Sequence, residues 1–310
     1  MEVSGYDFSK VTFSSSTVFG ETFNLIKMKK ILFPTAYTTH SKVAYRYTQK
    51  VAQYFNTGIT LVHIYSNPSA LPDSELEFVD EVSQQSLMTS DDERWEEELS
   101  KLKGFAIEMN AKQFQDISLD YVVTDGNVVV ELLEILKQDH FDLLVMGMRK
   151  HNVISRLFGN TTYQLIEKVD CPILLVPPGI TFSHIDKIVY GTSVKFGNRN
   201  AIDHLLDWSQ AFDASLHMLH LYRSKNKEAD ATLMTELKEE FIDENDAGII
   251  TFQMLKGNTK DIMAWYSAFK GAVLLAVHWR KQGILQEIME GNLIKTLVEK
   301  AQAPLLILKS

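Results

Sequence analysis

The sequence predicts an α/β protein built from two doubly wound domains in tandem, each with a five-stranded parallel sheet. Three observations carry this prediction. At about 150 residues per domain, a chain of 310 residues is long enough for two domains. Short apolar runs alternate with longer segments of helical periodicity, and the whole alternating pattern occurs twice along the chain.

The first set of elements begins at residue 28. Strands are predicted where short apolar or β-branched runs occur, at 31–34, 59–65, 117–123, 143–147 and 173–176. Helices are predicted between them because apolar residues recur at helical spacing, as do Val43, Tyr47, Val51 and Phe55, and Val129, Leu132, Leu133 and Leu136. The strands are apolar on both sides, as expected of a parallel sheet covered by helices on both faces.

The second set repeats the first at nearly constant offsets. Lys30-Ile31 recurs 157 residues later as Lys187-Ile188, and the strand end His63-x-Tyr65 recurs at the same offset. Gly126-Asn127 recurs only 131 residues later, as Gly257-Asn258. The difference places 26 additional residues in the first half, in the polar stretch around 66–92. For this stretch we expect a solvated loop or loose helix without a function of its own.

Residues 1–27 are rich in Ser and Thr and show no periodicity. We therefore expect a disordered tail that carries no function. It lacks the basic and apolar regions of a secretory signal. The first domain is expected over residues 28–178 and the second over 184–310, with the joint near Pro177-Pro178-Gly179.

Charge and composition exclude several classes of function. Lys and Arg number 31 against 40 Asp and Glu, and the resulting net charge of −9 repels nucleic acids and anionic membranes. The single cysteine, Cys171, excludes an internal disulfide and a multi-cysteine zinc site, and it fits a reducing compartment. No apolar run reaches the roughly 18 residues that a membrane span needs. We therefore expect a cytoplasmic protein with neither nucleic-acid nor membrane partners.

A ligand site is expected beyond the carboxyl ends of strands one and four, where the connections diverge to opposite faces of the sheet. The segment after the fourth strand begins at Gly147, contains the cations Arg149, Lys150 and Arg156, and reaches a helix start at 159–161. Exposed backbone N–H groups at a helix start favour an anion such as phosphate. Alternatively, Asn160 or Thr161 only caps the helix, and Gly159 only turns the chain.

No signature of catalysis accompanies this segment. The chain lacks the G-x-S-x-G, G-x4-G-K-[ST] and H-E-x-x-H patterns, so we expect no enzyme. His63 and His220 end the equivalent second strands, which suggests either a shared ligand role or, more commonly, two packed structural residues. Cys171 precedes Pro172 at a strand entry, where a buried, inert thiol is expected.

From Met28 to Lys309 the sequence resembles the tandem two-domain members of the universal stress protein family, in phrases such as ILFPT, LVHIY, DLLVMG and CPILLVP. The resemblance implies the strand order 3-2-1-4-5 in each domain. It also implies that the fifth strands of the two domains pair as an intramolecular pseudo-dimer, and it leaves a homo-oligomer open. The apolar fifth strands, 173–176 and 305–308, would otherwise be unprotected edges, so we expect them to pair antiparallel.

The family's nucleotide-binding members carry G-x2-G-x9-G-[ST] after strand four and an Asp two residues beyond the first-strand proline. Here Gly147 and Gly159 match two of the glycines, Lys150 replaces the other, Asn160 replaces the hydroxyl residue, and Ala36 stands at the Asp position. The resemblance implies ATP or ADP as a ligand of the first domain, and Ala36 and Lys150, which depart from the family's motif, predict that it binds weakly. The residues expected to hold it are Pro34, Thr35, Ala36, Gly126, Gly147, Arg149, Lys150, Gly159, Asn160 and Thr161.

In the second half only Gly291 of the motif's glycines remains, and Glu287 and Glu290 precede it. Their charge repels phosphate, so we expect that site to be empty. The resemblance implies a regulatory or binding module of the stress response. An ATP-binding switch or weak ATPase that uses the first domain is the alternative.

Overall fold

The computed structural model describes residues 28–65, 90–110, 116–148, 160–192, 199–222, 227–241, 250–256, 273–279 and 303–309. The 1–27 tail and most of the 66–92 stretch lie outside the described residues. The same is true of several residues singled out in the sequence: Arg149, Lys150, Arg156, Gly159, Gly257, Glu287, Glu290 and Gly291.

The first half follows the predicted alternation of strands and helices. Its elements are β1 (Lys30–Pro34), α1 (Thr39–Phe55), β2 (Gly58–Tyr65), α4 (Asp91–Met109), β3 (Leu119–Asp125), α5 (Val128–Gln138), β4 (Leu143–Gly147), α6 (Asn160–Lys168) and β5 (Ile173–Val176). The third strand begins two residues later than its apolar run predicted, because its register is set by β2: Leu119 pairs with Ile59 and Asp125 with Tyr65.

The second half repeats this succession. It contains β6 (Lys187–Thr192), α7 (Arg199–Phe212), β7 (Ser215–Tyr222), α8 (Lys227–Phe241), β8 (Ile250–Lys256), β9 (Val273–His278) and β10 (Leu305–Leu308). The pairing of His220 with Met254 across β7 and β8 matches that of His63 with Val123 across β2 and β3. The duplication that the offsets predicted is thus present in the strand registers.

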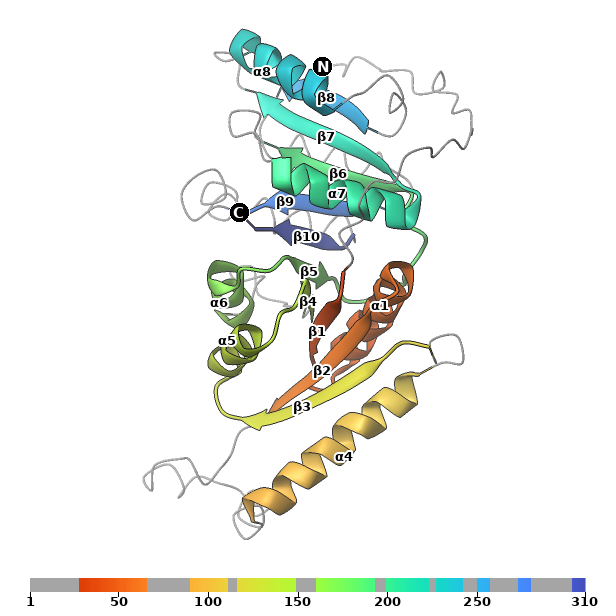
Figure 1. Ribbon diagram of the computed structural model, residues 1–310, viewed down its shortest axis with the longest axis vertical. Coiled ribbons are helices and arrows are strands. Elements are labelled where there is room, and N and C mark those ends of the chain that lie inside the picture. The colour runs from red at the N-terminus through yellow and green to blue at the C-terminus, as the bar shows by residue number, and fades with distance from the viewer. Residues whose placement is uncertain are drawn as a thin grey trace, which may run out of the picture.

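The ten strands of the described residues form one sheet in the order β3-β2-β1-β4-β5-β10-β9-β6-β7-β8. The first half therefore has the order 3-2-1-4-5, as the resemblance implied, and the second half mirrors it. The predicted pairing of the fifth strands is confirmed, since β5 and β10 run antiparallel with Leu174 opposite Leu306. Figure 1 shows the strands following one another along the long axis of the molecule, from β8 to β3.

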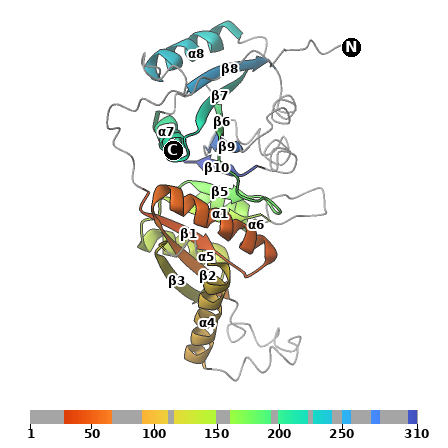
Figure 2. The same cartoon turned by 90° about the vertical axis from the view of Figure 1, so that its right-hand side faces the viewer.

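Helices cover both faces of this sheet. Buried residues of α1, α4 and α7 form one hydrophobic cluster with the strand residues facing them, and α5 and α6 contribute to a second cluster on the other face. Figure 2 shows α1 and α7 on the same face of the sheet. Because helices pack on both faces of the sheet, the strands are apolar on both sides.

Aromatic side chains join the two halves on the α1 face. The ring of Phe182, in the connecting segment, lies 4.9 Å from that of Tyr47 in α1. The rings of Phe55 and Trp208 are 5.1 Å apart, and those of Tyr54 and Phe212 are 4.5 Å apart. Because α7 contributes Trp208 and Phe212, the halves share a core in addition to the β5–β10 pairing.

The acidic segment that begins at Asp91 forms helix α4. The Ser90 hydroxyl accepts a hydrogen bond from the Glu93 N–H, and the Glu93 carboxylate accepts one from the Ser90 N–H. This capping box satisfies two backbone donors at the start of α4. Farther along, the indole N–H of Trp95 donates to the Val123 carbonyl at 3.1 Å. A carbonyl of β3, the end strand of the sheet, is thereby blocked against pairing with another chain.

Candidate functional site

The candidate site lies at the carboxyl ends of β1 and β4, which are neighbours in the sheet. Thr35, directly after β1, is only 6% exposed, and its N–H donates to the Val62 carbonyl at 2.8 Å. The Thr35 hydroxyl accepts from the Tyr37 N–H at 3.1 Å. The segment containing Pro34, Thr35 and Ala36 is thus folded against β2 by its own backbone.

Gly147, at the end of β4, lies directly beneath helix α1. A Cβ atom at this position would be 2.9 Å from the His40 carbonyl oxygen and 3.0 Å from the Ala44 Cβ. Real Cβ atoms do not approach backbone oxygen so closely, so glycine is required here by the packing of α1. The sequence singled out Gly147 for a ligand, and the structure adds this packing role.

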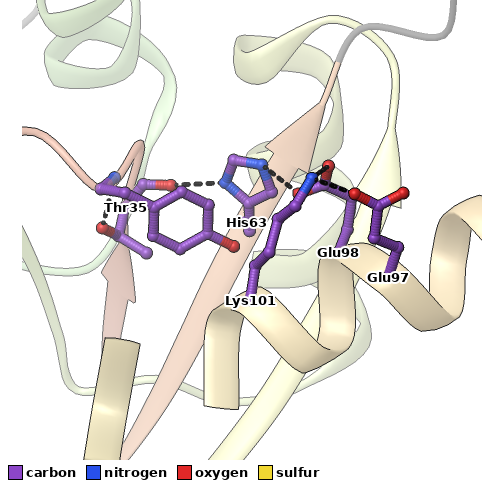
Figure 3. Close-up of polar contacts among 6 residues, drawn as sticks. Thr35, His63, Glu97, Glu98 and Lys101 are labelled. Atoms are coloured by element: carbon purple, nitrogen blue, oxygen red, sulfur yellow. Dashed lines mark hydrogen bonds and ion pairs between the residues drawn. The ribbon is translucent and has the colours of Figure 1, made fainter. Parts of the chain in front are cut away.

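His63, near the end of β2, connects the β1 loop to α4 (Figure 3). Its Nδ1 lies 2.8 Å from the Thr35 carbonyl oxygen, and its Nε2 lies 3.3 Å from the Glu98 carboxylate. A carbonyl oxygen can only accept, so Nδ1 carries a proton in this arrangement. On the outer side, Lys101 Nζ contacts Glu98 at 2.9 Å and Glu97 at 2.7 Å. The interactions form a continuous polar chain from the strand end to the surface of α4.

Tyr37 covers the inner side of this chain. Its backbone φ is 57°, a left-handed conformation that is uncommon for a residue with a bulky side chain. Its ring stacks on the His63 imidazole with the centroids 4.4 Å apart, and it also contacts Phe105. Burial, together with the nearby Glu98 carboxylate, raises the pKa of the Tyr37 hydroxyl. The tyrosine is therefore a neutral packing element at neutral pH.

The second half has a corresponding pair. His220 Nε2 lies 3.2 Å from the Asp230 carboxylate, and both side chains are almost fully buried. In both halves a histidine near the end of the second strand thus contacts a carboxylate of the following described helix. This arrangement supports the structural reading of the two histidines over a shared ligand role.

Gly126 and its neighbour shape the start of α5. Gly126 has φ 125°, and its N–H donates to the Tyr65 carbonyl at 3.0 Å. The Asn127 side chain accepts from the N–H groups of Val129 and Val130, at 3.0 and 3.3 Å. The recurring Gly-Asn pair is therefore, in the first half, a turn followed by a helix cap.

Of the remaining predicted site residues, Asn160 and Thr161 lie in the first turn of α6. Arg149, Lys150 and Gly159 fall outside the described residues. The structure therefore describes only part of the predicted set of site residues. Sequence reasoning missed Tyr37 and Lys101 entirely. Nothing local in the sequence marks Glu98 as a partner of His63.

The described residues contain no group of three or more His, Cys, Asp or Glu side chains that could hold a metal ion. Among the described helices, none is both long and apolar enough to cross a bilayer. Burial raises the pKa of Cys171 to about 12. The thiol is therefore protonated at neutral pH. The sequence predicted a buried thiol, but Cys171 is only partly buried, because it precedes β5 at the edge of the sheet.

Comparison with known proteins places this geometry in a family. No curated protein matches the chain. The sequence model of the universal stress protein family, however, matches residues 27–177. The first half of the chain is a universal stress protein domain.

Solved structures extend the likeness of fold to both halves. A universal stress protein from Archaeoglobus fulgidus DSM 4304 superimposes with a TM-score of 0.59 at 15% identity, covering 90% of this chain and 98% of that one. A functionally unknown protein from Pseudomonas aeruginosa PAO1 gives a TM-score of 0.58 at 14% identity, covering 91% and 92%. Together with the internal repeat, these similarities describe a tandem arrangement of two segments with the universal stress protein fold.

Proposed function

We propose that the chain is a cytoplasmic regulatory binding module of the stress response that catalyses no reaction. Its two domains would span residues 28–178 and 184–310, with residues 1–27 as a tail. The observation that carries the proposal is the packing at the first-half strand ends. There Thr35 is folded against β2, Tyr37 stacks on His63, and Gly147 contacts α1.

In this packing the polar groups at the strand ends contact one another. The His63 imidazole at this edge faces the Thr35 carbonyl on one side and the Glu98 carboxylate on the other. A general base must reach the proton that it removes. Among the described residues no nucleophile lies against His63, which supports a binding role over turnover.

The alternative is an ATP- or ADP-binding switch in the first domain. Helix α6 begins at Asn160, on the segment that follows β4, and helix starts favour phosphate. The site would also use Thr161 and the cations Arg149 and Lys150. Ala36 in place of an acidic residue removes an acceptor for the sugar or base. We therefore expect a dissociation constant in the micromolar range or weaker, where micromolar corresponds to about 8 kcal/mol.

The second domain is expected to bind no nucleotide. His278 and Trp279 occupy the strand end that corresponds to Gly147 and Met148 in the first half, and the Trp279 side chain is buried. Bulky side chains at this position limit how closely a ligand can approach the backbone.

The test is to denature the purified full-length protein, identify any released nucleotide, and separately measure phosphate release from ATP. We expect less than one nucleotide per chain and no phosphate release above that of buffer. A nucleotide held stoichiometrically would favour the switch. Hydrolysis abolished by Thr161→Val but retained by Thr235→Val, a matched change on the exposed face of α8, would overturn the non-catalytic assignment.

A further inference from the structure

A cavity of about 490 Å³ lies at the opposite edge of the first-half sheet, away from the candidate site. Its walls include Asp142, which precedes β4, and Cys171 and Pro172, which precede β5. These positions mark the amino ends of the strands. The volume falls within the range of about 300–1,000 Å³ that is typical of small-molecule sites.

Both halves of the chain build this cavity. His204, on α7 of the second half, forms part of its wall. Because Ile307 pairs with Ile173 in the antiparallel seam, the end of β10 reaches the start of β5. Lys309 there acts electrostatically on the Cys171 thiol from outside the lining, and its Nζ donates to the Ile166 carbonyl. Asp142, which does line the cavity, acts on both Cys171 and His204. The lining therefore combines polar side chains of both halves.

The floor of the cavity is apolar. It is lined by Leu133 and Leu136 of α5 and by Phe141, Val169 and Pro172. Phe141 and Val169 are buried, and both leucines pack against the same hydrophobic cluster. Such a surface accommodates the hydrocarbon part of a ligand and gains from its removal from water.

The rim of the cavity carries the charge. Lys137 and Lys168 lie in the last turns of α5 and α6, where they line the cavity together with Asp170. Lys137 contacts Glu134 at 2.7 Å, whereas no carboxylate of the described residues pairs with Lys168. Asp142 accepts from the backbone N–H groups of Lys29 and Lys30, at 2.7 and 3.1 Å, so its carboxylate is already hydrogen-bonded.

Two polar side chains of the cavity wall, His204 and Cys171, are uncharged at neutral pH. Burial lowers the pKa of His204 and raises that of Cys171 to about 12. At neutral pH the interior wall therefore offers an uncharged imidazole and an uncharged thiol. The cationic group available to an acidic ligand is Lys168, and the lining also contains the Asp170 carboxylate two residues away.

We propose that this cavity binds a small amphipathic monocarboxylate, whose hydrocarbon body lies on the Leu133, Leu136 and Phe141 floor and whose carboxylate pairs with Lys168. The neutral His204 in the cavity wall has one ring N–H that it can donate to a carboxylate, which only accepts. Since the wall includes both halves, the ligand would bind to their junction. This inference is independent of any nucleotide at the other edge of the sheet.

The test uses octanoate as the probe and Cys171 as the reporter. The chain has one cysteine, so maleimide labelling of the full-length protein, followed by intact mass, reports on this cavity alone. Because the raised pKa of the partly exposed Cys171 thiol makes the reaction slow, labelling is followed over hours at about pH 8.5, where the free protein must label measurably. Octanoate should slow labelling saturably, and octan-1-ol, which has the same chain without the charge, should protect far less. Lys168→Met should raise the half-protecting concentration of octanoate roughly tenfold or more, as expected for loss of a charge-assisted contact.

Lys103→Met removes an exposed lysine of α4, outside the cavity lining, and should leave protection unchanged. Labelling that is insensitive to octanoate up to its solubility limit would overturn the proposal. Equal protection by octanoate and octan-1-ol, or an unchanged response in Lys168→Met, would overturn it as well, because the binding would then depend on hydrocarbon alone.

Discussion

Replacing Gly147 by Ala tests whether this glycine is required by packing. The new methyl group would lie 2.9 Å from the His40 carbonyl oxygen and 3.0 Å from the Ala44 Cβ. Both neighbours belong to α1, and the nearer atom is backbone, so no side-chain rotation can relieve the contact. Helix α1 must shift as a whole by a few tenths of an ångström.

The cost follows from two opposing effects. Overpacking of a tightly packed site destabilises by about 1–3 kcal/mol. The smaller conformational freedom of alanine in the unfolded chain returns roughly 0.4–1 kcal/mol. We therefore expect Gly147→Ala to lower the free energy of unfolding of the first domain by about 1–2 kcal/mol.

The matched control is Gly104→Ala in the middle of α4. Apart from the neighbouring backbone of α4 itself, no atom lies within 4 Å of a Cβ built there. Alanine is favoured over glycine inside a helix by roughly 0.5–1 kcal/mol. This variant should therefore be more stable than the wild type. Urea denaturation followed by tyrosine and tryptophan fluorescence measures both. A Gly147→Ala protein as stable as the wild type would refute the packing argument.

Three further predictions each concern a single residue. Burial, aided by the charge of Lys187, lowers the pKa of His217 from 6.5 to about 4, so unfolding takes up a proton as the pH falls through this interval. At about 1.36 kcal/mol per pKa unit, the free energy of unfolding should fall by about 3 kcal/mol more in the wild type than in His217→Gln between pH 7 and pH 4. Urea titrations at the two pH values measure this difference, and equal losses in the two proteins would contradict the prediction. Asn127→Ala removes the cap of α5 and should cost about 1 kcal/mol in the same urea assay, whereas an unchanged midpoint would mean that the cap is dispensable. Trp95→Phe keeps a ring but loses the hydrogen bond to the Val123 carbonyl, which leaves a β3 carbonyl open to pairing with another chain. Aggregation on warming, followed by light scattering, should therefore begin at a lower temperature than in the wild type; an unaltered onset would show that this bond does not protect β3.

The sequence was sufficient for the architecture because that part of the structure depends on repeating patterns. Apolar runs marked the strands, and the recurrence of His63-x-Tyr65 as His220-x-Tyr222 revealed the duplication. The unprotected apolar fifth strands led to the seam in which Leu174 faces Leu306. Each of these signals is local or periodic and is therefore visible without coordinates.

The polar chain at the strand ends could not be predicted in the same way. It brings together residues 35, 63 and 98 from three elements, and no spacing in the sequence links them. The left-handed backbone of Tyr37 is also unpredictable, because it contradicts the preference of a bulky residue and accompanies a ring stack on His63, a residue of another element. The glycine at 147 was noticed, but its requirement by α1 depends on a contact between elements distant in sequence.

The most direct test of the proposed function is calorimetric titration of the full-length protein with ATP. The packed strand ends of the first half and the His278-Trp279 strand end of the second predict at most one site per chain, with a dissociation constant in the micromolar range or weaker. They also predict that this binding is lost in Gly159→Val and retained in Gly291→Val. Two sites per chain, or one with a submicromolar constant, would contradict the account of a binding module with a degenerate nucleotide site.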